Sequence, residues 1–394
     1  MSDATPLALR EFHEKLGARY TSVNGFEAVA DYGDMLAEHT ALHKTAGVLD
    51  LSFRSRLCLT GADRARFLHG QVTNDVKKLR AGEGCYAALV TAKGRMESDL
   101  NLFALQDELL LDFEPGLGPA ITQRLEKYIV ADDVQVVDVA PHYGLFSVQG
   151  PKAEAVVRRL GLFAELPDVP FRVTSLADSS LGEIYLMNLP RLAGSAGIRP
   201  ASSSDLKGPK HPPDASAPGV GGFDLFIPLA ALTSMADKLV AAAKAVGGAA
   251  CGWAAFEAAR IEAGVPRYGA DMDEANLPLE CGIEARAISY NKGCYIGQEV
   301  INRIHSIGHV NRALRGLRLA DDLAALPAKG DKLFKAGKEA GYITSAVFSL
   351  RLKANIALGY VRREADVPDG ELILRLGEKE TVARIVDLPF GVWR

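Results

Sequence analysis

Residues 289–299 read Ser289-Tyr290-Asn291-Lys292-Gly293-Cys294-Tyr295-Ile296-Gly297-Gln298-Glu299. Gly293 and Gly297 permit positive φ, so the sequence predicts a tight loop around Cys294. Residues 298–304 contain good helix formers and an apolar stripe, which predicts a helix directly after the loop. Cys294 is then expected just before a helix N-terminus and close to the ammonium of Lys292, and both neighbours lower the pKa of a thiol. The alternative is a small buried side chain, the commoner role of a lone cysteine.

The composition predicts a water-soluble chain of two or three domains. The chain has 394 residues, 48% of them apolar, and a net charge of −4, which argues against a general binder of nucleic acid or anionic membranes. No apolar run is long enough to span a membrane, and the first residues lack the features of a secretory signal. The five cysteines are scattered without a Cys-x-x-Cys pair. This usage is typical of a reducing cytoplasm and gives no support for a zinc ribbon.

The first 140 residues predict one α+β unit. Strands are expected at residues 57–60, 84–91, 96–105, 108–113 and 134–139, and helices at 7–16, 62–69 and 117–129. This alternation is typical of a split βαβ arrangement.

Residues 141–250 predict a second α+β unit, a degenerate repeat of the first. Its strands are expected at 143–149, 183–189 and 223–227, and its helices at 152–160 and 229–246. Residues 194–222 are rich in Ser, Pro, Gly and Ala, and they predict a flexible insertion. Residues 251–312, with a helix at 252–263 followed by the cysteine motif, are expected to complete the core of the two units.

Residues 313–394 predict a separate all-β domain. Six short strands are expected at close spacing, separated by glycine-containing turns, and the pattern fits a barrel or a sandwich. The expected strands are 314–319, 332–335, 341–348, 356–361, 371–376 and 381–386.

Several motifs carry a resemblance to a known superfamily. Residues 292–299, Lys-Gly-Cys-Tyr-Ile-Gly-Gln-Glu, closely resemble the signature of the YgfZ family of folate-binding proteins, which are relatives of the glycine-cleavage T-protein, or aminomethyltransferase. Further stretches are similar to T-protein motifs over roughly residues 40–390: 47–52, 67–76, 147–153, 260–266, 278–280, 356–361 and 388–390. The resemblance implies a T-protein-like α+β fold in which two α+β units form a folate-binding core and a small β-barrel follows.

The resemblance also implies a function. A YgfZ-type protein would bind tetrahydrofolate or a one-carbon derivative and support the assembly or maintenance of iron–sulfur enzymes through Cys294. Its partners would be iron–sulfur proteins or their assembly factors, and its location the cytoplasm. The main alternative is a folate-dependent one-carbon transferase, either an aminomethyltransferase or a demethylase. A second alternative is a non-catalytic interaction scaffold.

The resemblance assigns folate-site roles to four residues, Asp99, Tyr86, Arg260 and Lys292. The T-protein strand Gly-Gly-x-x-Asp-Asp corresponds to residues 94–99, where Ser98 replaces one aspartate and Asp99 remains. Asp99 would lie near the reactive nitrogen of the folate and Tyr86 would stack on a ring, while Arg260 would hold the pterin or the glutamyl tail. The structural alternatives are a solvated strand residue for Asp99, simple packing for Tyr86, and for Arg260 a helix-surface ion pair with Glu257 or Glu262.

The chain departs from the T-protein pattern in a second place. The family's Tyr-Thr-Gly-Glu-x-Gly-Phe-Glu motif corresponds to residues 217–224, Ala-Pro-Gly-Val-Gly-Gly-Phe-Asp, where the pterin-binding glutamate is missing. Pterin recognition is therefore expected to be weaker, or to use Asp224 or Glu183. No metal site is predicted, because His305 and His309 have no acidic partner nearby in the sequence. No dinucleotide or nucleotide motif follows a strand.

Overall fold

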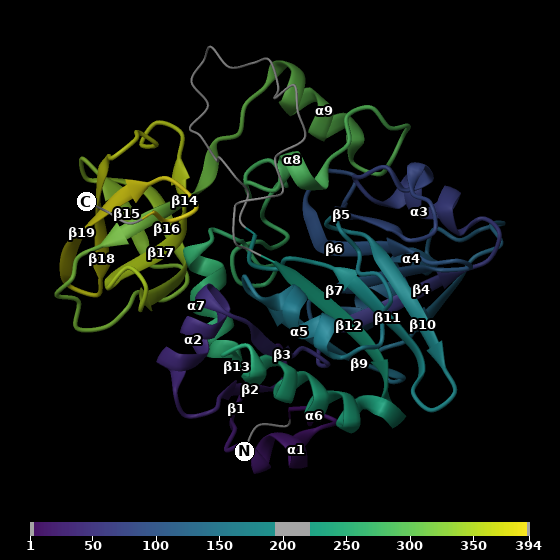
Figure 1. Cartoon of the computed structure of the whole chain (residues 1–394). Helices are drawn as coiled ribbons and strands as arrows, with labels where there is room; N and C mark the ends of the chain where they lie inside the picture. Colours follow the sequence, from purple (N-terminus) through teal and green to yellow (C-terminus); the bar gives the residue numbers. More distant parts are fainter. Residues whose placement is uncertain (1–3, 194–220, 392–394) are drawn as a thin grey trace. The chain divides into compact units, whose positions relative to one another are not determined.

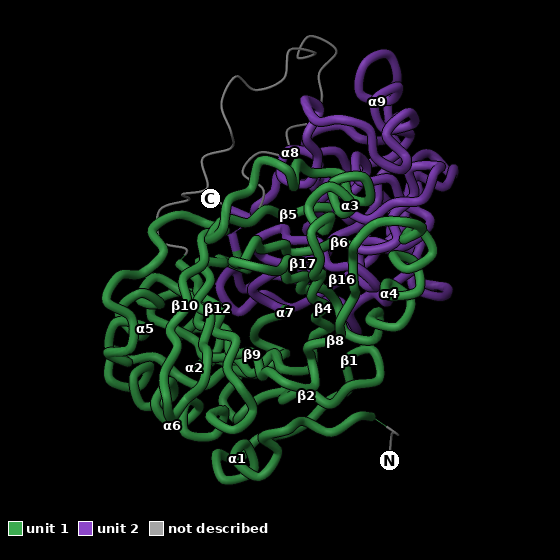
Figure 2. The backbone as a smooth tube through the Cα atoms, turned by 90° about the vertical axis from the view of Figure 1, so that its right-hand side faces the viewer, with its two compact units in different colours: residues 1–87, 99–192, 218–257 green, residues 88–98, 193–217, 258–394 purple. Residues whose placement is uncertain are grey.

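The computed structural model describes residues 4–193 and 221–391. The chain forms two compact units (Figure 2). Unit 1 comprises residues 1–87, 99–192 and 218–257, and unit 2 comprises residues 88–98, 193–217 and 258–394.

A five-stranded sheet, ordered β5-β6-β7-β4-β8, carries the first half of unit 1. The end of the β5–β6 hairpin, residues 88–98, is counted with unit 2. The strands are buried along most of their length, as the apolar runs of the sequence predict. The elements are β4 (Ser55–Thr60), α3 (Arg64–Gln71), η1 (Val76–Lys78), β5 (Glu83–Val90), β6 (Met96–Ala104), β7 (Leu109–Phe113), α4 (Gly118–Glu126) and β8 (Gln135–Asp138).

A six-stranded sheet, ordered β10-β11-β12-β9-β3-β13, carries the second half of unit 1 (Figure 1). Its central strands β9 and β12 pair antiparallel, with Phe226 opposite Leu145, and α5 and α6 pack against them. The apolar side of α6, including Leu232, Met235 and Leu239, closes this core. The elements are β3 (Gly47–Asp50), β9 (Tyr143–Gln149), α5 (Ala153–Arg159), β10 (Val173–Asp178), β11 (Gly182–Asn188), β12 (Gly222–Pro228), α6 (Leu229–Ala245) and β13 (Ala249–Ala250).

The N-terminal segment of unit 1 adds a small two-stranded sheet and two helices. They are α1 (Arg10–Lys15), β1 (Arg19–Val23), β2 (Phe26–Asp31) and α2 (Met35–Lys44). His13 of α1 is buried and contacts Asp50 at the end of β3, with 2.9 Å between Nε2 and Oδ2. This contact ties the N-terminal helix to the six-stranded sheet.

Unit 2 contains a closed barrel ordered β14-β17-β16-β15-β18-β19. Leu317, Ile343 and Leu374 are among the side chains that fill its interior. The chain reaches the barrel through α7 (Trp253–Glu262), which begins in unit 1, α8 (Glu284–Ala287) and α9 (Gln298–Ile307). The strands are β14 (Arg312–Leu319), β15 (Lys332–Lys335), β16 (Lys338–Ser349), β17 (Ala354–Arg362), β18 (Glu371–Leu376) and β19 (Lys379–Val386).

The predicted α+β fold with a C-terminal β-barrel is confirmed. The choice between barrel and sandwich is settled by pairing of β14 with both β17 and β19, which leaves no open edge. The predicted insertion lies outside the described residues from 194 to 220, and its last residue, Gly222, begins β12. Among the described residues, no helix is both long and apolar enough to cross a membrane.

Candidate functional site

Asp99 and Tyr86 face each other on neighbouring strands of unit 1. Asp99 lies on β6 and Tyr86 on β5, and the Tyr86 hydroxyl donates a hydrogen bond of 2.8 Å to Asp99 Oδ2. The Asn74 side chain donates to the Tyr86 carbonyl at 2.8 Å, so the Thr-Asn-Asp turn holds this strand in place. The sequence prediction that these two residues belong together is thus matched by a direct contact, while their role toward a folate stays a prediction.

The Asp99 carboxyl is poised between its protonated and ionised forms near neutral pH. Burial raises the pKa of Asp99 from its ordinary 3.8 to about 6, and the negative charge of Glu114 adds to this effect. The hydrogen bond from Tyr86 and the positive charge of Arg54 act in the opposite direction and are outweighed. A carboxyl group with such a pKa can both release and accept a proton under physiological conditions.

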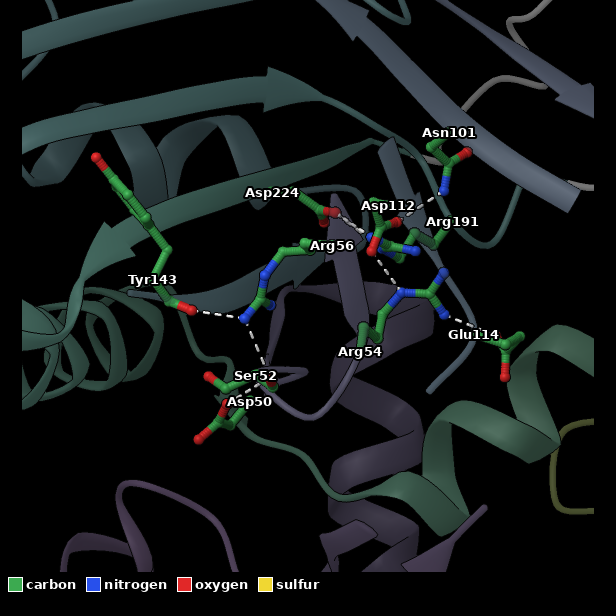
Figure 3. A network of polar contacts seen from close by, with 10 residues as sticks. All are labelled: Asp50, Ser52, Arg54, Arg56, Asn101, Asp112, Glu114, Tyr143, Arg191 and Asp224. Atoms are coloured by element: carbon green, nitrogen blue, oxygen red, sulfur yellow. Dashed lines mark hydrogen bonds and ion pairs between the residues drawn. The ribbon is translucent and has the colours of Figure 1, made fainter. Parts of the chain in front are cut away.

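Figure 3 shows a buried network of charged side chains, and two of its members, Arg54 and Glu114, act electrostatically on Asp99. Arg54 donates to Asp112 at 2.8 Å and to Glu114 at 2.6 Å, and Asn101 donates to Asp112 at 2.9 Å. Arg191 contacts Asp112 at 2.8 Å and Asp224 at 2.9 Å. Although burial acts to raise it, the pKa of Asp112 is held well below its usual range by Arg191 and Arg54.

The network carries two guanidinium groups and three carboxylates. The charge of Glu114 opposes ionisation of the neighbouring Asp99, whereas the charge of Arg54 favours it. The network therefore helps to set the protonation state of Asp99.

Arg56 is a third buried arginine of this region, and it binds backbone carbonyls instead of carboxylates (Figure 3). Its Nη2 donates to the carbonyls of Ser52, Ala140 and Tyr143, which join the start of β4 to the segment before β9. Burial lowers the pKa of Arg56 to about 10, so it remains charged at neutral pH.

The Cys294 loop lies in unit 2, directly before α9. Cys294 is exposed, and α9 starts at Gln298 with Gly297 as its N-cap, as the sequence predicts. Gly297 has φ of 84°, whereas Gly293 is not among the residues with positive φ. Lys292 is buried and its Nζ lies 4.7 Å from the centre of the Tyr295 ring, a cation–π contact within the loop.

A cluster of polar side chains joins the two ends of this segment. The Tyr290 hydroxyl donates to Glu284 at 2.6 Å, and His305 Nδ1 lies 2.9 Å from the same oxygen. The rings of Tyr290 and His305 stack with 3.8 Å between their centres. The expectation that His305 lacks an acidic partner is wrong, because Glu284, 21 residues away, is brought to it by the fold.

The other predicted residues are engaged elsewhere. Arg260 is buried within unit 2, where it ion-pairs with Asp271 and donates to Ser345 Oγ at 2.9 Å, so it is not a helix-surface residue. Asp224, a suggested replacement for the missing glutamate, is buried against Arg191. Glu183, the other suggestion, is exposed on β11.

Sequence reasoning missed the charged network around Arg54. A signal was present, because Arg54 directly precedes the apolar strand β4, and Asp112 and Glu114 lie at the end of the apolar strand β7. Charged residues inside or next to a fully buried strand are expected to be paired. The sequence gives no indication of the partner, because Arg54 and Asp112 are 58 residues apart.

Two α+β sheets followed by a closed barrel, with an acid-bearing strand in the first sheet, define the class of this protein. The chain belongs to the glycine-cleavage T-protein family. Residues 9–187 and 218–292 match the GCVT N-terminal domain, and residues 312–391 match the glycine cleavage T-protein C-terminal barrel domain.

Known relatives extend over nearly the whole chain. It is 27% identical to an aminomethyltransferase of Shouchella clausii, over 97% of this chain and 96% of the relative. It is 28% identical to an aminomethyltransferase of Rubrobacter xylanophilus, over 97% of this chain and 93% of the relative. The crystal structure of glycine cleavage system aminomethyltransferase T from Bartonella henselae has the same fold, with a TM-score of 0.81 and 23% identity over 99% of both chains. The T-protein resemblance is confirmed, and the relatives' name agrees with the transferase alternative better than with the YgfZ-type interpretation.

Proposed function

We propose that the protein is a folate-dependent one-carbon transferase in which Asp99 is the proton-handling residue. The observation that carries this proposal is the Tyr86–Asp99 pair, a fixed carboxyl group whose pKa is raised to about 6. A folate-binding transferase needs such a group beside the nitrogen that changes its bonding. Membership of the T-protein family and relatives named aminomethyltransferase support the same reaction class.

In this proposal Asp99, Tyr86 and Asn74 have different roles. A reduced folate supplies the nitrogen that accepts the one-carbon unit. Asp99 Oδ takes up or returns a proton at neutral pH, because its pKa lies close to that range. Tyr86 fixes the carboxyl group through a hydrogen bond of 2.8 Å, and Asn74 fixes Tyr86 through its backbone.

The donor set fits a folate, with weaker pterin recognition than the T-protein pattern provides. A carboxylate pairs well with the amine and amide edge of a pterin, but Asp99 on β6 is assigned to the reacting nitrogen and not to that edge. Ser98 stands in place of a second aspartate, and Asp224 is committed to Arg191. We therefore expect binding of tetrahydrofolate at roughly micromolar Kd.

The reaction can be tested with the whole chain, tetrahydrofolate and an aminomethyl thioether donor. Transfer of the methylene group releases ammonia and a thiol, and both the ammonia and the methylene-folate can be measured. Asp99→Asn should lower the rate on the order of a hundredfold or more, whereas Asp107→Asn, an exposed aspartate between β6 and β7, should leave it unchanged. Equal rates for wild type and Asp99→Asn would overturn the proposed role, and the absence of any folate-dependent turnover with either an aminomethyl or an N-methyl donor would overturn the reaction class.

A second candidate is the YgfZ-type role in iron–sulfur protein maintenance. The observation in its favour is that Cys294 is exposed at the start of α9 within the Lys-Gly-Cys-Tyr-Ile-Gly-Gln-Glu motif. Its partners would be iron–sulfur proteins or their assembly factors in a reducing cytoplasm, to which five free cysteines are suited. In cells lacking the protein, Cys294→Ala would then fail to restore iron–sulfur enzyme activity while Asp99→Asn restores it. The transferase proposal predicts no iron–sulfur defect in such cells, and a folate-dependent activity that Cys294→Ala keeps and Asp99→Asn loses. Restoration of iron–sulfur enzyme activity by both variants would favour a non-catalytic scaffold.

A further inference from the structure

A cavity of about 510 Å³, open to solvent, lies on the outside of the barrel of unit 2, and no feature of the proposed reaction uses it. Its lining includes three cationic side chains, Arg312 of β14, Lys332 of β15 and Arg362 of β17. Tyr342 and Tyr360 line it as well, together with two carboxylates, Glu339 and Glu364. Such a polar, cationic lining is unsuited to an apolar ligand.

Two of the three cations are already paired within unit 2. Lys332 contacts Glu339 at 3.2 Å. Arg312 contacts Glu280 at 3.3 Å and donates to the Ala275 carbonyl at 2.7 Å. Arg362 and Glu364, by contrast, have no ion pair or side-chain hydrogen bond within residues 4–193 and 221–391. Arg362 therefore offers a free guanidinium fork at the cavity.

Tyr342 supplies a second free donor. Its hydroxyl oxygen accepts a hydrogen bond of 2.9 Å from Arg312 Nη1, and the Asn276 side chain also hydrogen-bonds to it as a donor. Burial raises the pKa of Tyr342 despite the opposing charge of Arg312, so the hydroxyl stays protonated at neutral pH. In the part of the chain that the structure describes, no side chain or carbonyl accepts the proton of this hydroxyl. A half-buried donor of this kind can hydrogen-bond to water or to a ligand oxygen.

We propose that this cavity binds a small carboxylate-bearing metabolite, held by the Arg362 guanidinium and the Tyr342 hydroxyl. An arginine fork and a hydroxyl donor match the two oxygens of a carboxylate. A phosphate would fit the same donors, but its higher negative charge is disfavoured by Glu339 and Glu364 in the lining. Lys332 lies 5.5 Å from the Tyr342 ring centre and adds positive charge at the same place. The proposal is independent of the folate reaction, since all of its residues belong to the barrel and its strands.

Calorimetry with the full chain tests this site, with lactate, glutamate and inorganic phosphate as probes. Lactate or glutamate, each with a net charge of −1, should bind saturably and more tightly than phosphate. Arg362→Gln should raise Kd at least tenfold, and Tyr342→Phe, which keeps the ring, should raise it severalfold. The matched control is Arg384→Gln on β19, an exposed arginine of the same barrel that pairs with Glu371.

Three results would overturn the proposal. The first is the absence of saturable binding by either carboxylate, and the second is phosphate binding more tightly than both. The third is an equal loss of affinity in Arg384→Gln and Arg362→Gln, which would indicate general attraction to a cationic surface. Arg362 is exposed at the end of its strand, so its substitution should leave the melting temperature of the protein unchanged, and a melting curve checks this.

Discussion

The raised pKa of Asp99, the residue proposed to handle the proton, implies a cost to the stability of the folded protein. In the folded protein its pKa is about 6, against an ordinary 3.8, so the folded state favours the protonated form. Between these two pH values the folded protein binds more protons than the unfolded chain, and its stability falls as the pH rises. Above pH 6 the ionised carboxylate destabilises the fold by about 2–3 kcal/mol.

Asp99→Asn should therefore stabilise the protein at pH 8 by about 1–3 kcal/mol, because asparagine keeps an acceptor for Tyr86 and carries no charge. The gain should shrink toward zero as the pH falls below 4. Urea unfolding at a series of pH values measures it, with Asp107→Asn as the exposed control. A stabilisation that does not depend on pH would contradict the raised pKa.

Cys294 should be the most accessible of the five thiols. It is exposed, Cys85 is half-buried, and Cys58, Cys251 and Cys281 are buried. Limiting iodoacetamide followed by peptide mass spectrometry should find Cys294 labelled first and Cys85 next, because alkylation requires access to the sulfur. Labelling of Cys294 no faster than Cys58 or Cys251 would reject it as a reactive site.

Cys281 adjoins Gly282 in the sequence, but the structure buries it completely, with Sγ 3.2 Å from the Leu277 carbonyl oxygen. The sequence placed Asp99 and Tyr86 on adjacent strands because a hairpin is a local feature with a readable alternation. It could not reveal the burial of Cys281 or the pairing of Arg260 with Asp271, because both depend on packing against the barrel strands.

At the level of elements, the junction before α9 depends on Gly297. An added Cβ there would lie 2.5 Å from the Thr91 carbonyl oxygen and 2.9 Å from Val90, and the backbone has φ of 84°. Gly337, in the turn between β15 and β16, has a similar φ of 77° with nothing within 4 Å of the added Cβ. A comparison of alanine substitutions at these two positions therefore separates the cost of the left-handed backbone from the cost of steric overlap.

Gly297→Ala should destabilise unit 2 by several kcal/mol, whereas Gly337→Ala should cost only about 1 kcal/mol, from the left-handed backbone alone. Denaturant unfolding monitored by circular dichroism gives both values. Equal losses of stability in the two variants would show that the segment around Thr91 and Val90 moves away from the added methyl group at little cost in free energy.

Elements with weak sequence signals were not foreseen. The strand β10, Val173-Thr174-Ser175-Leu176-Ala177-Asp178, is an edge strand that pairs only with β11 in its sheet and keeps none of its residues fully buried. Its composition consequently lacks the apolar alternation that identified β9 and β12. The short strand β13 forms because α6 returns the chain beside β3, which is a tertiary effect.

At the scale of the whole molecule, Arg191 joins the two sheets of unit 1. Its guanidinium contacts Asp112 on β7 of one sheet and Asp224 on β12 of the other, and all three side chains are buried.

Arg191→Met should destabilise the protein by about 3–5 kcal/mol, because two buried carboxylates would lose their shared cation. Arg158→Met, which removes an exposed pair with Glu154, should cost less than about 0.5 kcal/mol. A small loss in Arg191→Met, measured by urea unfolding, would show that water or Arg54 can replace it.

Binding of a reduced folate should stabilise the molecule, because a ligand that binds only the folded state shifts the unfolding equilibrium. At a concentration of tetrahydrofolate about one hundred times Kd, the gain is about 2.7 kcal/mol, which is expected to raise the melting temperature by a few degrees.

Asp99→Asn should melt higher than wild type without ligand and yet gain less from tetrahydrofolate, because it cannot offer an ionised carboxylate to the pterin. Cys294→Ala should gain as much as wild type, since Cys294 is assigned no part in holding the folate. The quantity compared is the rise in melting temperature that tetrahydrofolate causes in each variant. The change in stability that Asp99→Asn causes without ligand therefore does not affect the comparison. An equal shift in wild type and Asp99→Asn would remove Asp99 from the folate site, and no shift with any reduced folate would remove the site itself.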